Sequence, residues 1–188
     1  MVYNAAMSAC EKGEQWMQAL RVLAEMQQQD LEPSSVSFNA AISACEKGRH
    51  WEWALELLHE MRRASIQLSA VTCNAALSAC ERGRHWELAL QLLHEMKHSS
   101  VSPDCISCTA LLGACETVRK WGVMLDLMSD MRLRRITLDT TMCSITMHAC
   151  YKEGHGVWAR SLALLVEIQG RRIASNTVSF ESGIRASY

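Results

Sequence analysis

The residues whose types and spacing come closest to a catalytic pattern are His94, Glu95 and His98, in the stretch HEMKH. Two histidines one helical turn apart can bind zinc, and the glutamate beside the first can act as a general base, as in zinc proteases. A zinc protease also needs a third ligand and a substrate cleft, and this helix is expected to end at Ser99 and Ser100. We therefore predict no metal at this stretch.

A second candidate is the cysteine pair Cys105 and Cys108, in the stretch CISC. A second pair at zinc-ribbon distance is missing, so this pair predicts no metal site either. The chain has 9 cysteines, and five of them lie at intervals of 35 residues: Cys10, Cys45, Cys80, Cys115 and Cys150. This spacing places each in its own structural unit, where a reduced cysteine packs as a small hydrophobe. We predict a reducing compartment, no disulfide framework, no cofactor and no enzymatic activity.

The interval of 35 residues extends over the whole chain and accounts for both candidates. The segments YNAAMSACEKGEQW, FNAAISACEKGRHW and CNAALSACERGRHW begin at Tyr3, Phe38 and Cys73, and diverged copies begin at Cys108 and Cys143. In this register Glu95 matches an acid in every unit, whereas its neighbouring histidines vary from unit to unit. HEMKH is therefore interpreted as part of a helix-packing template, and Cys108 as an apolar packing residue.

Each unit predicts two helices, for example residues 36–47 and 51–63. The first is small and apolar on one side, and the second carries apolar residues at helical spacing. Glycines at the end of the first helix are expected to form left-handed caps; they are Gly13, Gly48 and Gly83. His50 and His85 are expected in the inter-helix turn, covering a tryptophan ring, and the tryptophans are expected to pack between repeats.

One helical hairpin cannot bury its apolar stripe, whereas stacked hairpins share a continuous core. The predicted fold is all-α, a right-handed α-solenoid (superhelix) of two-helix repeats with a concave inner face. The expected repeats of the single array 1–188 are 1–34, 35–69, 70–104, 105–139, 140–176 (with a two-residue insertion around Gly154 to Gly156) and a partial sixth repeat at 177–188. Since the sequence begins and ends inside a helix, we expect a fragment of a longer array.

Charge and hydropathy narrow the choice of function. Apolar residues make up 49% of the 188 residues, which is enough to form a buried core. The formal net charge is -1, so charge gives no support for non-specific affinity for nucleic acids. No apolar run approaches the roughly 18 residues that a spanning helix needs. We predict no membrane association and no signal peptide.

The pattern N-A-A-I-S-A-C-E-K-G, followed by W and by A-L-x-L-L-x-E-M, resembles the pentatricopeptide repeat family at its strict period of 35 residues. The related tetratricopeptide repeats are 34 residues long. The resemblance covers essentially the whole chain. It implies binding of single-stranded RNA in mitochondria or plastids, with one repeat reading one base through a few side chains.

The resemblance assigns base reading to two polar positions of each repeat. The position on the first helix is held by Asn4, Asn39, Asn74, Thr109 and Ser144, and the last residue of the repeat is Ser34, Ser69, Asp104, Asp139 and Asn176. The side chains that would sandwich the bases are Met1, Val36, Val71, Ile106, Thr141 and Val178. In the family, Asn with Ser leans to a pyrimidine, Asn with Asp to uracil, Thr with Asp to guanine and Ser with Asn to adenine. The implied RNA, from its 5′ end, is pyrimidine-pyrimidine-U-G-A.

Two of these assignments have structural alternatives. The repeat-end residues are also of the types that cap a following helix. The cations that recur near the end of the first helix could follow a phosphate backbone, or could simply be favoured by the helix dipole; they are Lys12, Lys47, Arg82 and Lys152. The asparagines are harder to explain structurally, because asparagine is a mediocre helix former.

The sequence therefore predicts a modular, non-catalytic binder of single-stranded RNA that acts in organellar RNA processing, stability or translation. The alternative is a protein-protein interaction scaffold whose concave face takes a peptide or a partner helix. Near-neutral charge favours the scaffold, and the repeated polar residues favour RNA. We expect a monomer, with self-association through exposed terminal helices as the alternative.

Overall fold

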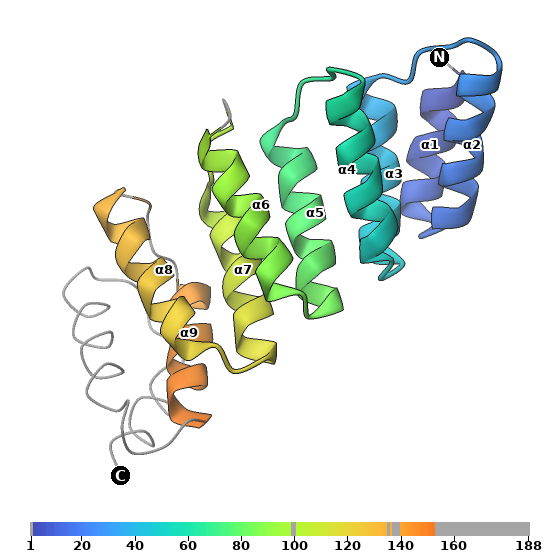
Figure 1. The fold of residues 1–188 in the computed structure, drawn as a ribbon. Coiled ribbons are helices and arrows are strands. Elements are labelled where there is room, and N and C mark those ends of the chain that lie inside the picture. Colours follow the sequence, from blue (N-terminus) through green and yellow to red (C-terminus); the bar gives the residue numbers. More distant parts are fainter. Residues whose placement is uncertain (1, 99–100, 135, 137–139, 153–188) are drawn as a thin grey trace. The chain divides into compact units, whose positions relative to one another are not determined.

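The computed structural model describes residues 2–98, 101–134, 136 and 140–152. The chain divides into two compact units, Met1–Pro103 and Asp104–Tyr188. Within the described residues the first unit contains α1 (Val2–Lys12), α2 (Trp16–Gln28), α3 (Ser35–Lys47), α4 (Trp51–Arg63), α5 (Ala70–Gly83) and α6 (Trp86–His98). The second contains α7 (Cys105–Thr117), α8 (Trp121–Leu133) and α9 (Thr140–Lys152). The prediction of an all-helical chain built from helix pairs is confirmed for these residues (Figure 1).

Two first helices of the first unit, α3 and α5, begin at side-chain caps. Ser34 accepts a hydrogen bond from the backbone N–H of Ser37 at 3.4 Å, and Ser69 accepts one from Thr72 at 3.2 Å. Such a cap satisfies one of the N–H groups that a helix start leaves without an intrahelical partner. As a result α3 and α5 start within one or two residues of these serines, and α3 and α4 match the predicted ranges to within one residue.

The core of the first unit lies between two layers of helices. The helices α1, α3 and α5 contact one another in sequence, while α2 packs on α1 and α3, and α4 packs on α3 and α5 (Figure 1). Small side chains let the first layer pack closely, because Ala40, Ala41, Ala44 and Cys45 of α3 are all buried. The second layer contributes Ala54, Leu57, Leu58 and Met61 of α4, the helical spacing that the sequence predicted.

The predicted left-handed caps at the glycines are wrong. Gly48 has φ -72° and Gly83 is still helical. The left-handed residue is the next one in each repeat, and it is not glycine: Glu14, Arg49, Arg84 and Arg119 have φ of 55°, 62°, 61° and 58°. The helix terminus thus has the expected geometry one residue later than the glycine pattern indicated.

The glycines at these sites are required by close packing between repeats. A Cβ atom at Gly48 would lie 2.9 Å from Cδ1 of Trp16, and one at Gly83 would lie 2.6 Å from Cδ1 of Trp51. Both distances are well inside van der Waals contact, which is about 3.5–4 Å between carbons. At Gly13, whose position has no described preceding repeat, the nearest atom is Ala9 O at 3.3 Å. The glycine therefore makes room for a tryptophan of the preceding repeat.

Trp16 and Trp51 pack between repeats, as predicted, and each is covered by a histidine of the following repeat. The ring centroids of Trp16 and His50 are 3.9 Å apart, as are those of Trp51 and His85. The histidines were expected to cover a tryptophan ring, and the structure shows that it is not the tryptophan next to them in sequence. Their stacking contributes on the order of 1 kcal/mol per pair.

The second unit repeats the local structure of the first. Asp104 caps α7 through its carboxylate, which accepts the backbone N–H of Ser107 at 2.8 Å. The helices α7, α8 and α9 contact one another, and their core contains Leu111, Leu112, Met124 and Met128. Among the described residues no helix is long and apolar enough to cross a membrane.

Several predictions fall outside the described residues: the two-residue insertion around Gly154, the partial sixth repeat, and the site residues Met1, Asp139, Asn176 and Val178. The side chain of Lys152, at the end of α9, is also outside the description.

Candidate nucleic-acid interface

An exposed aliphatic side chain stands at the second position of three successive odd-numbered helices. Val36 of α3 is 55% exposed, Val71 of α5 is 69% exposed and Ile106 of α7 is 61% exposed. Thr141 takes this position in α9 and is also exposed. Exposed β-branched residues do not stabilise a helix end, because they bury nothing and are mediocre helix formers. These are the residues that the sequence assigned to sandwiching bases.

Asn4 and Asn39, at equivalent positions of α1 and α3, have side chains that are held by the following repeat. The hydroxyl of Ser37 donates to Oδ1 of Asn4 at 3.2 Å. The hydroxyl of Thr72 donates to Oδ1 of Asn39 at 2.6 Å. The same hydroxyls contact the repeat-end serines, since Oγ of Ser34 lies 3.3 Å from Oγ of Ser37 and Oγ of Ser69 lies 2.8 Å from Oγ1 of Thr72.

The structure therefore brings together the two residues that the sequence paired in each of the first two repeats. Asn4 and Ser34 meet through Ser37, and Asn39 and Ser69 meet through Thr72. The repeat-end residues Ser34, Ser69 and Asp104 do cap the following helix, which is the structural alternative that the sequence left open. Capping does not exclude a second role, because each serine oxygen caps while its proton is directed at the neighbouring hydroxyl.

The hydroxyls that join these pairs were missed by sequence reasoning. Ser37, Thr72 and Ser107 are 0%, 1% and 0% exposed, although their polar groups make them costly to bury without hydrogen bonds. Their recurrence at intervals of 35 residues, in VSF, VTC and ISC, was the available signal. Each is the third residue of its helix, where a capping box places a side chain that faces the cap.

The fourth repeat lacks this arrangement. The third residue of α9 is Met142, which is fully buried. Thr109, the residue that corresponds to the asparagines, donates its hydroxyl proton to the carbonyl oxygen of Cys105 in its own helix at 2.8 Å. Ser144 of α9 is half-buried.

The recurring cations take part in ion pairs with the preceding repeat. Nζ of Lys47 lies 3.6 Å from Oε1 of Glu11, and Nη2 of Arg82 lies 2.8 Å from Oε1 of Glu46. Lys12 is exposed. The glutamates that precede the cations in sequence therefore neutralise the charge of Lys47 and Arg82 in part. These cations are held by ion pairs between repeats, and not by the helix dipole alone.

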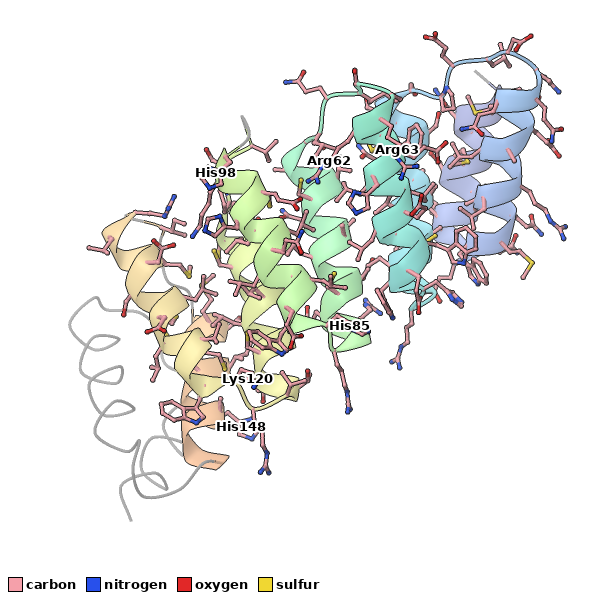
Figure 2. The ribbon with its side chains drawn as sticks, in the orientation of Figure 1. Arg62, Arg63, His85, His98, Lys120 and His148 are labelled. Carbon is pink, nitrogen blue, oxygen red and sulfur yellow. The ribbon has the colours of Figure 1, made fainter. Side chains whose placement is uncertain are left out.

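In the second unit, a histidine that the sequence analysis did not single out pairs with an acid of the preceding first helix. Nδ1 of His148 on α9 lies 2.7 Å from Oε1 of Glu116 on α7 (Figure 2). In the first unit the equivalent contact is made by Ser43, whose hydroxyl donates to Oε1 of Glu11 at 3.0 Å. In α1, α3 and α7 an acid near the end of the helix thus binds the next first helix.

The two histidines of HEMKH lie on the exposed side of α6, whereas Met96 is buried. Arg62 of α4, labelled in Figure 2, approaches Glu95 to 2.6 Å. Partial burial alone would raise the pKa of the Glu95 carboxyl, but hydrogen bonds from Arg62 and Gln91 hold the pKa below its usual value. His94 and His98 have ring centroids 5.0 Å apart and are both exposed. Within the described part of the chain, no group of three or more His, Cys, Asp or Glu side chains could hold a metal ion. Glu95 is thus a partner of the neighbouring helix.

The recurring cysteines are buried thiols. Cys10, Cys45, Cys80 and Cys115 are all buried, and every described cysteine is a free thiol. Burial raises the pKa of the Cys45 and Cys80 thiols to about 11. Both are therefore protonated at neutral pH, which suits a packing role.

Stacked two-helix units of constant length, joined by equivalent contacts 32 to 36 residues apart, define the class of helical-repeat proteins. The model of the pentatricopeptide repeat domain matches residues 1–47 and 56–118, and a second model of the same repeat matches residues 36–66. The chain belongs to the pentatricopeptide repeat family, and its α-solenoid fold is confirmed.

Solved structures with this fold cover nearly the whole chain. The pentatricopeptide repeat protein PPR10 from maize is 20% identical over 97% of the chain, with a TM-score of 0.71. The complex of PPR10 with an 18-nt psaJ RNA element has a TM-score of 0.74 at 22% identity over 96% of the chain. In each case the chain spans only 26% of the length of PPR10.

A shorter domain is matched over most of both lengths. The PPR domain of Arabidopsis thaliana protein-only RNase P 1, in complex with tRNA, has a TM-score of 0.82 at 11% identity. The match covers 93% of this chain and 91% of that domain. No curated protein sequence matches the chain significantly.

Proposed function

We propose that the chain is a non-catalytic binder of single-stranded RNA in which successive repeats contact successive bases. The observation that carries this proposal is the exposure of Val36, Val71 and Ile106 at the second position of their helices, each three residues before an asparagine or threonine on the same helix. An apolar side chain offers a flat base a surface to pack on, and the polar side chain beside it can hydrogen-bond the base edge. Packing of this kind contributes about 1–3 kcal/mol per base in other single-strand binders.

The amide groups supply hydrogen bonds of a defined kind. Oδ1 of Asn39 is occupied by Thr72, so the amide NH₂ is the group that remains for a base edge. An NH₂ donor suits a base whose Watson–Crick edge has an acceptor at its centre, such as N3 of cytosine. Between the two pyrimidines, this supports cytosine over uracil for the first two repeats.

Thr109 has the opposite hydrogen-bonding character. Its one hydroxyl proton is donated to the carbonyl oxygen of Cys105, so the remaining side of the oxygen can only accept. Guanine presents two neighbouring donors on its Watson–Crick edge, N1–H and the N2 amino group. The geometry of Thr109 therefore supports guanine at the fourth base.

Two known relatives support RNA as the ligand. PPR10 was solved with an 18-nt psaJ RNA element, and the PPR domain of protein-only RNase P 1 with tRNA. From the family resemblance we propose that the protein acts in RNA processing, stability or translation in a mitochondrion or plastid.

Charge favours a second candidate, a scaffold for a protein partner. The net charge is -1, and two of the recurring cations are paired with Glu11 and Glu46. A phosphate backbone would have to compete with these glutamates, whereas a peptide would not. Binding of a peptide and not of RNA by the same residues would favour the scaffold.

The test is a fluorescence-anisotropy titration of short RNAs at low salt. An RNA containing C-C-U-G-A should bind more tightly than a scrambled RNA of the same composition. Thr109→Asn should move the preference at the fourth base from guanine toward uracil, while Ser78→Ala, a change of a half-buried hydroxyl elsewhere on a first helix, should leave it unchanged. Equal affinity for both RNAs would refute base reading, and absence of binding to any RNA would refute RNA binding by this chain.

A further inference from the structure

A basic stretch at the end of α4 places two arginines just before an exposed serine. Arg62 and Arg63 are the last two residues of α4 and lie at the end of that helix (Figure 2). Ser65 follows them in the turn that leads toward α5, and it is exposed. Within the described residues its hydroxyl makes no hydrogen bond. The Ser65 hydroxyl is therefore accessible to a modifying enzyme.

The residues around Ser65 fit the charge pattern that one class of serine kinases selects. Kinases of the arginine-directed class bind substrates through carboxylates in the peptide groove, which pair with arginines shortly before the acceptor serine. Ser65 has arginine at the third and second preceding positions, and the apolar Ile66 directly after it. Ser35 and Ser102 are also exposed, but neither has an arginine among the three preceding residues. Among the serines that the structure describes, Ser65 is thus the one that matches such an enzyme.

The backbone around Ser65 is held by the cap at the end of α4. The backbone N–H groups of Ala64, Ser65 and Ile66 donate to carbonyl oxygens of the last helical turns at 2.9, 3.0 and 2.9 Å. A kinase binds its substrate in an extended form, so these hydrogen bonds have to open first. Helix ends open more readily than helix interiors, and the fully buried Met61 confines the unwinding to the last turn.

The fold already carries a negative side chain at the equivalent place of the first repeat. Asp30 precedes Ser65 by 35 residues, and the two residues have φ of 54° and 55°. Asp30 is exposed as well. A phosphorylated Ser65 would carry a charge of about -1.5 to -2 at the same exposed turn. The turn therefore accommodates the charge of a modified serine.

The two arginines differ in how firmly they are held. Arg62 approaches Glu95 of α6 to 2.6 Å, and the two side chains are 32% and 34% exposed. Arg63 lies 3.7 Å from Glu56 of its own helix, and these side chains are 76% and 57% exposed. An ion pair as open to water as the second one contributes little. A kinase must therefore take Arg62 away from Glu95, whereas Arg63 is accessible from the start.

We propose that Ser65 is a phosphorylation site for an arginine-directed serine kinase, and that the ion pair between Arg62 and Glu95 restrains access to it. In the reaction the γ-phosphoryl group of ATP moves to Oγ of Ser65. A bond from phosphorus to Oγ forms, and the bond to the oxygen that bridges the β- and γ-phosphates breaks. The hydroxyl proton passes to a carboxylate of the kinase, and ADP leaves. This proposal does not depend on RNA binding.

The test incubates the full chain with ATP and the catalytic subunit of cyclic-AMP-dependent protein kinase, an arginine-directed enzyme. Mass spectrometry should find phosphate on Ser65, and Ser65→Ala should reduce the total incorporation. A synthetic peptide of residues 59–68 is the positive control, and it should react faster because it has no helix cap to open. A phosphorylated peptide together with an unmodified Ser65 in the folded chain would overturn the proposal.

Glu95→Gln tests the restraint, because it keeps the size of the side chain and removes the charge that holds Arg62. The initial rate of phosphorylation at Ser65 should rise about 2–5-fold, the range that a partly exposed ion pair provides. Glu56→Gln is the matched control, because it removes only the weak partner of Arg63, and the rate should change less than about 1.5-fold.

These rates are compared at a temperature where circular dichroism shows that every variant is fully folded. A faster reaction in Glu95→Gln is then due to the release of Arg62 and not to unfolding. An unchanged rate in Glu95→Gln, or an equal increase in both variants, would overturn the proposed restraint.

Discussion

The glycine that faces the preceding tryptophan gives the sharpest test of how the repeats are joined. In Gly83→Ala the new methyl group would lie 2.6 Å from Cδ1 and 2.9 Å from Cγ of Trp51, and 3.0 Å from Cδ2 of His85. It would therefore overlap both rings of a stacked pair whose centroids are 3.9 Å apart. Either the tryptophan leaves its stacked position or α5 moves away from α4.

The expected magnitude follows from two opposing terms. Overpacking of a fitted contact costs about 1–3 kcal/mol. Alanine offsets part of this because it is roughly 0.5–1 kcal/mol better than glycine within a helix. We expect a net loss of about 0.5–2 kcal/mol, which corresponds to a fall of roughly 2–6 °C in melting temperature for a chain of this size.

The assay is thermal unfolding followed by circular dichroism at 222 nm, with two matched controls. Gly13→Ala changes the equivalent position without a described tryptophan partner, and Gly122→Ala changes a helical glycine whose Cβ would meet nothing within 4 Å. Neither control should lower the melting temperature. In a Trp51→Leu background the penalty of Gly83→Ala should also disappear. A Gly83→Ala protein as stable as the two controls would refute the packing explanation.

Three further outcomes are expected. Val71→Ala should lower RNA affinity roughly 2–5-fold without loss of thermal stability, because the side chain is 69% exposed, whereas Met17→Ala, an exposed residue of α2, should change neither; equal affinities of the Val71 variant and the wild type would contradict base packing there. Glu46→Gln should release Arg82 and raise RNA affinity at low salt by about 2-fold, with a steeper salt dependence of binding; an unchanged salt slope would exclude Arg82 from phosphate contact. The free energy of unfolding should fall as pH rises from about 9 to 11, by an amount on the order of 2 kcal/mol per thiol. The reason is that Cys45 and Cys80 ionise at lower pH in the unfolded chain than in the fold, where burial raises the pKa to about 11. The fall with pH should be shallower in Cys45→Ala/Cys80→Ala, and an identical fall would contradict the role of these thiols.

The period of 35 residues made the fold predictable, because a helix pair inferred for one unit applies to every other unit in the same register. The ends of α3 and α4 agree with the sequence since caps and apolar spacing are local signals. The role of Gly48 was not local. It depends on Trp16 of the preceding repeat, and a sequence pattern does not distinguish a glycine needed for φ from one needed for space.

The register predicted which residues take equivalent positions in successive repeats, but not the hydrogen bonds between them. The aliphatic side chains at the second helix position and the asparagines three residues later follow from this register alone. The link from Asn39 through Thr72 to Ser69 joins residues 33 and 3 positions apart, and its donor order depends on which group has a proton. The ion pair between Arg82 and Glu46 escaped prediction for the same reason, because it pairs each cation with the glutamate of another repeat.

The most direct measurement compares the RNA affinity of the wild type with that of Asn4→Ala/Asn39→Ala/Asn74→Ala, using the RNA that contains C-C-U-G-A and confirming by circular dichroism that the helices are intact. Each amide should contribute about 0.5–1.5 kcal/mol, so the triple variant should bind at least about 10-fold more weakly. It should also lose its preference for this RNA over a scrambled one at the first three bases. Unchanged affinity and unchanged preference in a folded triple variant would contradict the assignment of these asparagines to an RNA-binding surface.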